Sequence, residues 1–119
     1  MARVLILGLS GFVGFRLARQ LESEHAISGT YHHSCPEEID YSMRALDSTD
    51  RAALREMLLQ NQADVIVNCV GMSNVDACEK DPQTASRVNF EFVRDLVQVI
   101  KNDCRVTYFI QLSSNAVYD

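Results

Sequence analysis

Blocks of consecutive apolar residues alternate along the chain with segments in which apolar residues recur every three or four positions. The apolar blocks predict buried strands, at residues 3–8, 26–31, 43–46, 65–71 and 105–112. The helical spacing predicts amphipathic helices, over residues 12–23, from the segment after Thr49 to about Gln60, and from Pro82 to about Asn102. Strands that alternate with helices are typical of an α/β fold with a parallel sheet and right-handed crossovers.

The same pattern predicts which helix faces pack against the sheet and where the helices begin. The residues expected to face inward are Val13, Leu17, Ala18 and Leu21 in the first helix, and Ala53, Leu54, Met57 and Leu58 in the second. Ser48 or Thr49 is expected to cap the second helix. Asp81 is expected to cap the third, with Pro82 at its first position.

Three glycines follow the first predicted strand and open the first helix: Gly8, Gly11 and Gly14. Gly8 permits a tight turn, Gly11 lets a pyrophosphate approach the backbone, and Gly14 lets the helix lie close to the sheet. The helix then directs its free N–H groups and the positive end of its dipole at the phosphates. Three glycines alone would also suit a turn that serves packing, but the strand before them and the helix after them favour dinucleotide binding.

This arrangement predicts a Rossmann-type, doubly wound parallel sheet with strand order 3-2-1-4-5, in which the pattern stops after the fifth strand. The ligand crevice of such a sheet lies beyond the carboxyl ends of its strands. The end of the second strand lies about 20 residues beyond the glycines, where an acid selects NAD. The residues there are Thr30, Tyr31, His32, His33 and Ser34. Without an acid, NADP is favoured, and NAD remains open, as does the alternative that the histidines have no role.

Length and charge limit the class of protein. A chain of 119 residues predicts one domain, residues 1–119. A net charge of −5 without a basic run argues against nucleic acid or an anionic membrane as the main partner. The first apolar run is too short for a signal peptide or a membrane span, so a cytoplasmic protein is expected. Its cysteines, Cys35, Cys69, Cys78 and Cys104, have no C-x-x-C spacing, which favours reduced thiols over disulfides or a metal site.

Several segments together resemble the extended short-chain dehydrogenase/reductase superfamily, and within it the dTDP-4-dehydrorhamnose reductase group. They are the glycine turn, Leu46–Asp50, Asp64–Gly71, Val75–Glu79, Val88–Asn89 and Leu112–Tyr118. The resemblance implies binding of NADP, or of NAD, and a nucleotide-sugar substrate. It covers nearly the whole chain.

The resemblance also implies roles for individual residues. The pyrophosphate loop would comprise Gly8, Ser10, Gly11, Phe12 and Val13; Asp47 and Ser48 would lie by the adenine; and Val70, Gly71 and Ser73 would lie beneath the nicotinamide half. Asn89 would brace the active-site strand, and Ser114 would donate a hydrogen bond to the substrate carbonyl. Simpler roles stay open: Asp47 and Ser48 as helix caps, Asn68 and Asn89 as buried amides, and Ser114 as a turn residue.

One departure from the family pattern concerns catalysis. The resemblance implies a catalytic Tyr followed four positions later by a Lys, but none of the four tyrosines has that neighbour. The chain is therefore expected to be the incomplete N-terminal part of a nucleotide-sugar reductase, inactive alone. The alternatives are a non-catalytic dinucleotide-binding regulatory subunit, a fragment of an NAD-dependent epimerase or dehydratase, and a protein that kept the fold without a ligand. The fifth strand would be an open sheet edge, so self-association through it is expected.

Overall fold

A single parallel sheet of five strands organises the described residues. The structure is a computed structural model that describes residues 2–32, 40–47, 50–70, 83, 90–103 and 108–112. The strands are β1 (Arg3–Leu7), β2 (Ala26–Tyr31), β3 (Ser42–Ala45), β4 (Val65–Asn68) and β5 (Tyr108–Gln111), and the helices are α1 (Phe12–Leu21), α2 (Arg51–Asn61) and α5 (Phe92–Asp103). The strand order is β3-β2-β1-β4-β5. This confirms the predicted α/β class and the predicted strand order.

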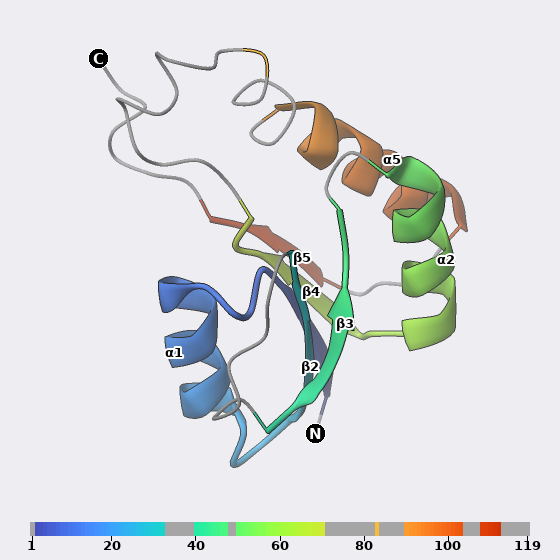
Figure 1. Ribbon diagram of the computed structural model, residues 1–119. Helices are drawn as coiled ribbons and strands as arrows, with labels where there is room; N and C mark the ends of the chain where they lie inside the picture. Colours follow the sequence, from blue (N-terminus) through green and yellow to red (C-terminus); the bar gives the residue numbers. More distant parts are fainter. Residues whose placement is uncertain are drawn as a thin grey trace.

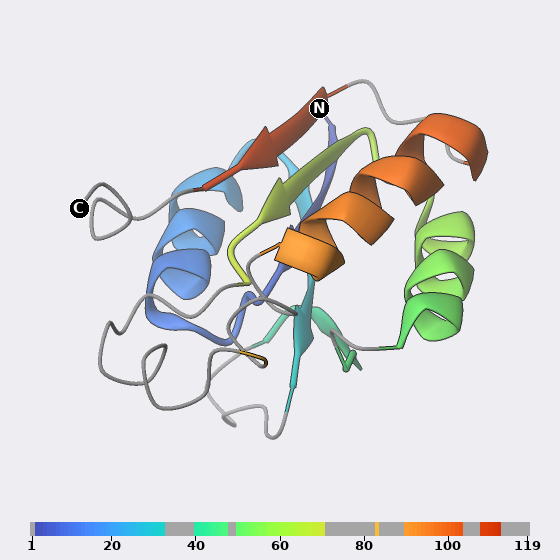
Figure 2. The same cartoon turned by 90° about the horizontal axis from the view of Figure 1, so that it is seen from above.

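Helices cover both faces of the sheet, with α1 on one face and α2 and α5 on the other (Figures 1 and 2). The central strand β1 pairs in parallel with β2, where Arg3 lies opposite Ala26, and with β4, where Val4 lies opposite Val65. Because β1 has a strand on each side and a helical layer on each face, its last four residues are all buried. This position accounts for the continuous apolar block in the sequence.

Two hydrophobic cores lie on opposite faces of the sheet. Alternate residues of β1 enter different cores, since successive side chains of a strand point to opposite faces. Val4 and Ile6 pack with Leu9 and Ala18 on the α1 side. On the other side, Leu5 and Leu7 pack against buried residues of α2 and α5, namely Leu54, Met57, Leu58, Phe92, Leu96 and Val99. The inward face predicted for α2 is confirmed.

The predicted start of α2 was wrong by one or two residues. Asp50 is the N-cap, and its Oδ1 accepts a hydrogen bond from the Ala53 N–H at 3.0 Å. The carboxylate therefore occupies the position expected for Ser48 or Thr49, both of which lie outside the described residues. The helix ends at Gln62, whose φ of 53° places it in the left-handed conformation often found at helix C-termini.

The inward face predicted for α1 is correct except at Val13. Ala18 is buried and Leu17 and Leu21 are partly buried in the α1 core, but Val13 is 54% exposed. Val13 belongs to the first turn of α1, which starts just beyond the end of β1, and it lies on the exposed side of that turn. The exposed first turn becomes important for the candidate site.

The remaining predicted boundaries differ by a few residues. β3 begins one residue earlier than predicted, and β4 ends at Asn68 instead of Gly71. Just beyond the end of β4, the Asn68 Oδ1 accepts a hydrogen bond from the Val70 N–H at 3.0 Å. The predicted Asp81 cap and Pro82 lie outside the described residues.

Candidate functional site

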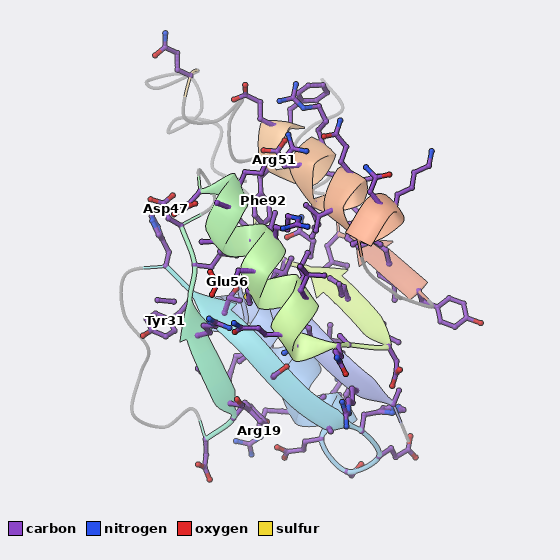
Figure 3. All side chains as sticks on the ribbon, turned by 90° about the vertical axis from the view of Figure 1, so that its right-hand side faces the viewer. Arg19, Tyr31, Asp47, Arg51, Glu56 and Phe92 are labelled. Carbon is purple, nitrogen blue, oxygen red and sulfur yellow. The ribbon has the colours of Figure 1, made fainter. Side chains whose placement is uncertain are left out.

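The residues predicted to bind a ligand follow the ends of different strands at one edge of the sheet. Gly8 follows β1, His32 follows β2, Asp47 lies two residues beyond β3, and Val70 lies two residues beyond β4. Because all the pairings are parallel, these positions share the carboxyl edge of the sheet. Figure 3 shows Asp47 between the end of β3 and the start of α2.

The turn after β1 connects the central strand directly to the N-terminus of α1. Gly8 has a φ of +80°, which side chains rarely tolerate. The Gly11 N–H donates to the Gly8 carbonyl at 3.0 Å, and the Gly11 carbonyl accepts from the Phe15 N–H at 3.0 Å. Gly11 is thus the N-cap of α1, and no side chain caps the helix. The N–H groups of residues 12–14 therefore have no acceptor within the helix.

Gly14 lets α1 approach the turn closely. A Cβ at Gly14 would lie 2.6 Å from the Gly8 oxygen and 2.8 Å from the Leu9 Cα, both of them backbone atoms. No side chain fits there without moving the turn. This agrees with the packing role that the glycine spacing predicts for the third glycine.

The first turn of α1 is accessible and carries no negative charge of its own. Gly11 and Val13 are exposed, Ser10 is partly buried, and the first turn contains no acidic residue. An uncapped helix N-terminus of this kind attracts anions through its free N–H groups and its dipole. The arrangement can hold a diphosphate beside the end of β1.

The other residues predicted to bind the ligand differ in exposure and in their neighbours. His32 and Asp47 are exposed, and the Asp47 carbonyl accepts from the Asp50 N–H at 3.0 Å. Val70 is partly buried, and its Cγ2 would lie 3.1 Å from a Cβ at Gly8, so it borders the glycine turn. The backbone of Phe12 opens α1. Five predicted residues lie outside the described part of the chain, as does the catalytic candidate: His33, Ser48, Gly71, Ser73, Asn89 and Ser114.

Two polar side chains at this edge are buried: Asn68, for which the sequence left the role of a buried amide open, and Thr30, whose contact with Gly8 the sequence pattern does not reveal. Asn68 is buried, donates from Nδ2 to the Gln111 Oε1 at 2.8 Å and accepts from the Val70 N–H at 3.0 Å. Thr30 is buried, and its Oγ1 accepts from the Gly8 N–H at 2.9 Å. For Asn68, the available signal was a polar residue at the end of an otherwise apolar strand.

Cys69, next to Val70, is a partly buried free thiol, and burial raises its pKa above the ordinary value of 9.0. This shift disfavours the reactive thiolate.

No group of three or more His, Cys, Asp or Glu side chains able to hold a metal ion occurs among the described residues. In the same part of the chain, no helix is long and apolar enough to cross a membrane.

The family of the chain follows from a match to a protein-family model. Residues 4–119 match the model described as the NAD dependent epimerase/dehydratase family. The chain belongs to this family. The match includes the glycine turn and every strand of the sheet, and it confirms the resemblance to extended short-chain dehydrogenases/reductases.

Individual curated proteins and solved structures are similar to this chain. The probable low-salt glycan biosynthesis reductase of Haloferax volcanii is 34% identical and is aligned over 96% of this chain. A dTDP-4-dehydrorhamnose reductase of Streptomyces griseus is 32% identical over 98% of this chain. A crystal structure titled hypothetical dTDP-4-dehydrorhamnose reductase from Sulfolobus tokodaii has a TM-score of 0.80 and 33% identity, and it covers 93% of this chain.

The chain spans about a third of the length of these relatives. The alignments cover 37% of the Haloferax protein, 34% of the Streptomyces protein and 38% of the Sulfolobus chain. The similarity therefore concerns only the third of each relative that aligns with this chain.

Proposed function

We propose that the chain binds a nicotinamide dinucleotide at the N-terminus of α1. The observation that carries this proposal is the uncapped, exposed first turn of α1, placed directly after the positive-φ Gly8 at the centre of the carboxyl edge. The diphosphate would accept hydrogen bonds from the N–H groups near Gly11, Phe12 and Val13, with Ser10 beside it. Gly14 would hold the helix close enough for this geometry.

The remaining parts of the dinucleotide would lie along the same edge. Asp47 and Ser48 would lie by the adenine, and Val70, Gly71 and Ser73 beneath the nicotinamide, with Asn89 bracing the adjacent strand. We propose NADP over NAD, because residues 30–34 contain no acid to accept from a ribose 2′-hydroxyl or to repel a 2′-phosphate. His32 and His33 can donate to that phosphate.

We also propose that this sheet belongs to a longer protein that reduces a 4-keto nucleotide sugar. The support is the names of the relatives, which include a dTDP-4-dehydrorhamnose reductase. The bound cofactor would supply hydride, and Ser114 would donate a hydrogen bond to the substrate carbonyl. The sequence contains no Tyr with a Lys four positions later, so the 119-residue chain alone is expected to show no turnover.

A non-catalytic dinucleotide-binding regulatory subunit is a second candidate, since such a subunit would need the same dinucleotide site. The family description equally suits a fragment of an NAD-dependent epimerase or dehydratase. The reading frame beyond codon 119 distinguishes these candidates. A Tyr-x-x-x-Lys in frame supports an enzyme, and its absence supports the regulatory role.

Calorimetric titration with NADPH, NADH and ADP-ribose tests dinucleotide binding. We expect ADP-ribose to bind, because it carries the diphosphate, and NADPH to bind more tightly than NADH. The variant Val13→Asp places a carboxylate at the exposed first turn, where it favours the helix but repels a diphosphate. The neutral Val13→Asn is its matched control. Equal affinities of the two variants, or no binding of any of the three ligands by the wild type, would overturn the proposal.

A further inference from the structure

Thr30 connects the end of β2 to the glycine turn after β1. The residue is 2% exposed, and its Oγ1 accepts a hydrogen bond from the Gly8 N–H at 2.9 Å. Buried polar groups are almost always hydrogen-bonded, so this pairing satisfies the buried hydroxyl oxygen. The donor is the amide of the glycine that has a positive φ.

The peptide group between Leu7 and Gly8 is held from both sides. Its N–H donates to Thr30, and its carbonyl, the Leu7 oxygen, accepts from the Cys69 N–H at 2.8 Å. Thr30 belongs to β2 and Cys69 directly follows β4. Both neighbours of β1 therefore fix this single peptide group, which sets the direction in which the chain leaves the central strand.

The Gly8 carbonyl connects this turn to the start of α1. The Gly8 oxygen accepts from the N–H of Gly11, the N-cap of α1, at 3.0 Å. The same oxygen lies so near Gly14 that a Cβ there would come within 2.6 Å of it. A rotation of the backbone at Gly8 would thus displace the N–H groups that open the helix.

We propose that Thr30 is a positioning residue for dinucleotide binding: its hydroxyl holds the Gly8 amide so that the N-terminus of α1 keeps the geometry that receives a diphosphate. The inference rests on the proposed function. Thr30 acts through Gly8 and does not touch the ligand. Without the hydroxyl, the Gly8 amide loses its acceptor and the turn can relax away from the binding geometry.

The experiment compares threonine with valine, and serine with alanine, at position 30. Within each pair, only the first residue has a hydroxyl. ADP-ribose affinity is measured by calorimetry for wild type, Thr30→Ser, Thr30→Val and Thr30→Ala. We expect serine to match wild type, and valine and alanine to bind about fivefold more weakly, the factor that corresponds to one net hydrogen bond of about 1 kcal/mol. If the valine variant does not fold, the serine and alanine variants carry the same comparison.

Ser28→Ala is the control for a general loss of stability. Ser28 lies two residues earlier on β2, and its Oγ accepts from the Asn61 Nδ2 at 3.1 Å, away from the glycine turn. This variant should lose stability but keep the wild-type affinity. Wild-type binding with equal affinity of the serine and alanine variants would overturn the inference alone. No binding by the wild type would overturn the proposed function, and this inference with it.

Discussion

At the scale of single residues, the three glycines of the turn have different physical roles. Gly8 provides a φ of +80°, and Gly14 provides room where a Cβ would collide with backbone. Gly11 has a φ of −77°, which any residue adopts, and is exposed at the helix N-terminus. The sequence spacing predicted a separate role for each glycine, and the structure agrees with the turn at Gly8 and the close packing at Gly14.

Substitution of Gly14 and of Gly11 should therefore have different effects. Gly14→Ala is expected to lower the free energy of unfolding by about 1–3 kcal/mol, because its Cβ would overpack the Gly8 carbonyl and Leu9. Gly11→Ala should change stability much less, since its Cβ would come only within 3.3 Å of the Gly8 oxygen. Urea unfolding measures both values. Equal losses in the two variants would contradict this account of the turn.

Tyr41 gives a pH-dependent contribution to stability. Burial first, and then the hydrogen bond that its hydroxyl donates to Glu22, raise the pKa of Tyr41 from 10.0 to about 12. Because the pKa of Tyr41 is higher in the folded than in the unfolded state, the protonated hydroxyl stabilises the fold fully below pH 10. This stabilisation is lost as the pH rises to about 12. The stability difference between wild type and Tyr41→Phe should therefore shrink between pH 10 and 12. A difference that stays constant or grows over that window in urea titrations would refute this.

At the scale of elements, two side chains at the start of α2 cap this helix and contact α5. Asp50 caps α2, and the Arg51 Nη2 donates to the Gln98 Oε1 at 2.8 Å across to α5. The Arg51 Nη1 also lies 3.7 Å from the Asp95 Oδ1, which makes an ion pair between α2 and α5. Figure 3 shows Arg51 and Phe92 near the ends of α2 and α5 that lie side by side. Polar contacts thus cap the start of α2 and connect it to α5.

The variant Asp50→Ala is expected to lower the free energy of unfolding by about 1 kcal/mol, the usual value of an N-cap side chain. Asp50→Asn keeps an oxygen that can accept the Ala53 N–H, so it is the matched control and should retain most of the stability. Urea midpoints of the three proteins provide the comparison. If alanine and asparagine unfold at the same midpoint, the cap is not the source of the stability.

Some features of the strands and helices could be predicted from the sequence, and others could not. Strand β1 and the inward face of α2 followed from apolar periodicity, because burial leaves a direct pattern in the sequence. The cap of α2 and the end of β4 did not. Ser48 and Thr49 were the expected caps, but Asp50 is the cap observed. At the end of β4, the Asn68 side chain accepts the Val70 N–H, which no apolar pattern shows. The role of Thr30 depends on contact with Gly8 across 22 positions, which periodicity cannot show.

At the scale of the whole molecule, β5 lies at one edge of the described sheet, and Tyr108 and Ile110 on it are 66% and 48% exposed. We propose that the 119-residue chain self-associates along this edge, because an edge strand presents unpaired N–H and C=O groups. Light scattering should show a mass that rises with concentration. Ile110→Lys should reduce this association, whereas Val97→Lys, at an exposed position on α5, should not. A constant monomer mass for the wild type would contradict the proposal.

The central claim about the whole molecule is that a diphosphate binds at the helix end which follows the central strand. Backbone amide chemical shifts, measured by NMR during titration with ADP-ribose, test it most directly. The account predicts the largest changes at Gly11, Phe12, Val13 and Gly14, with smaller changes at the ends of β2 and β4. Saturable binding with shifts confined to other regions, or no shifts at all, would contradict it.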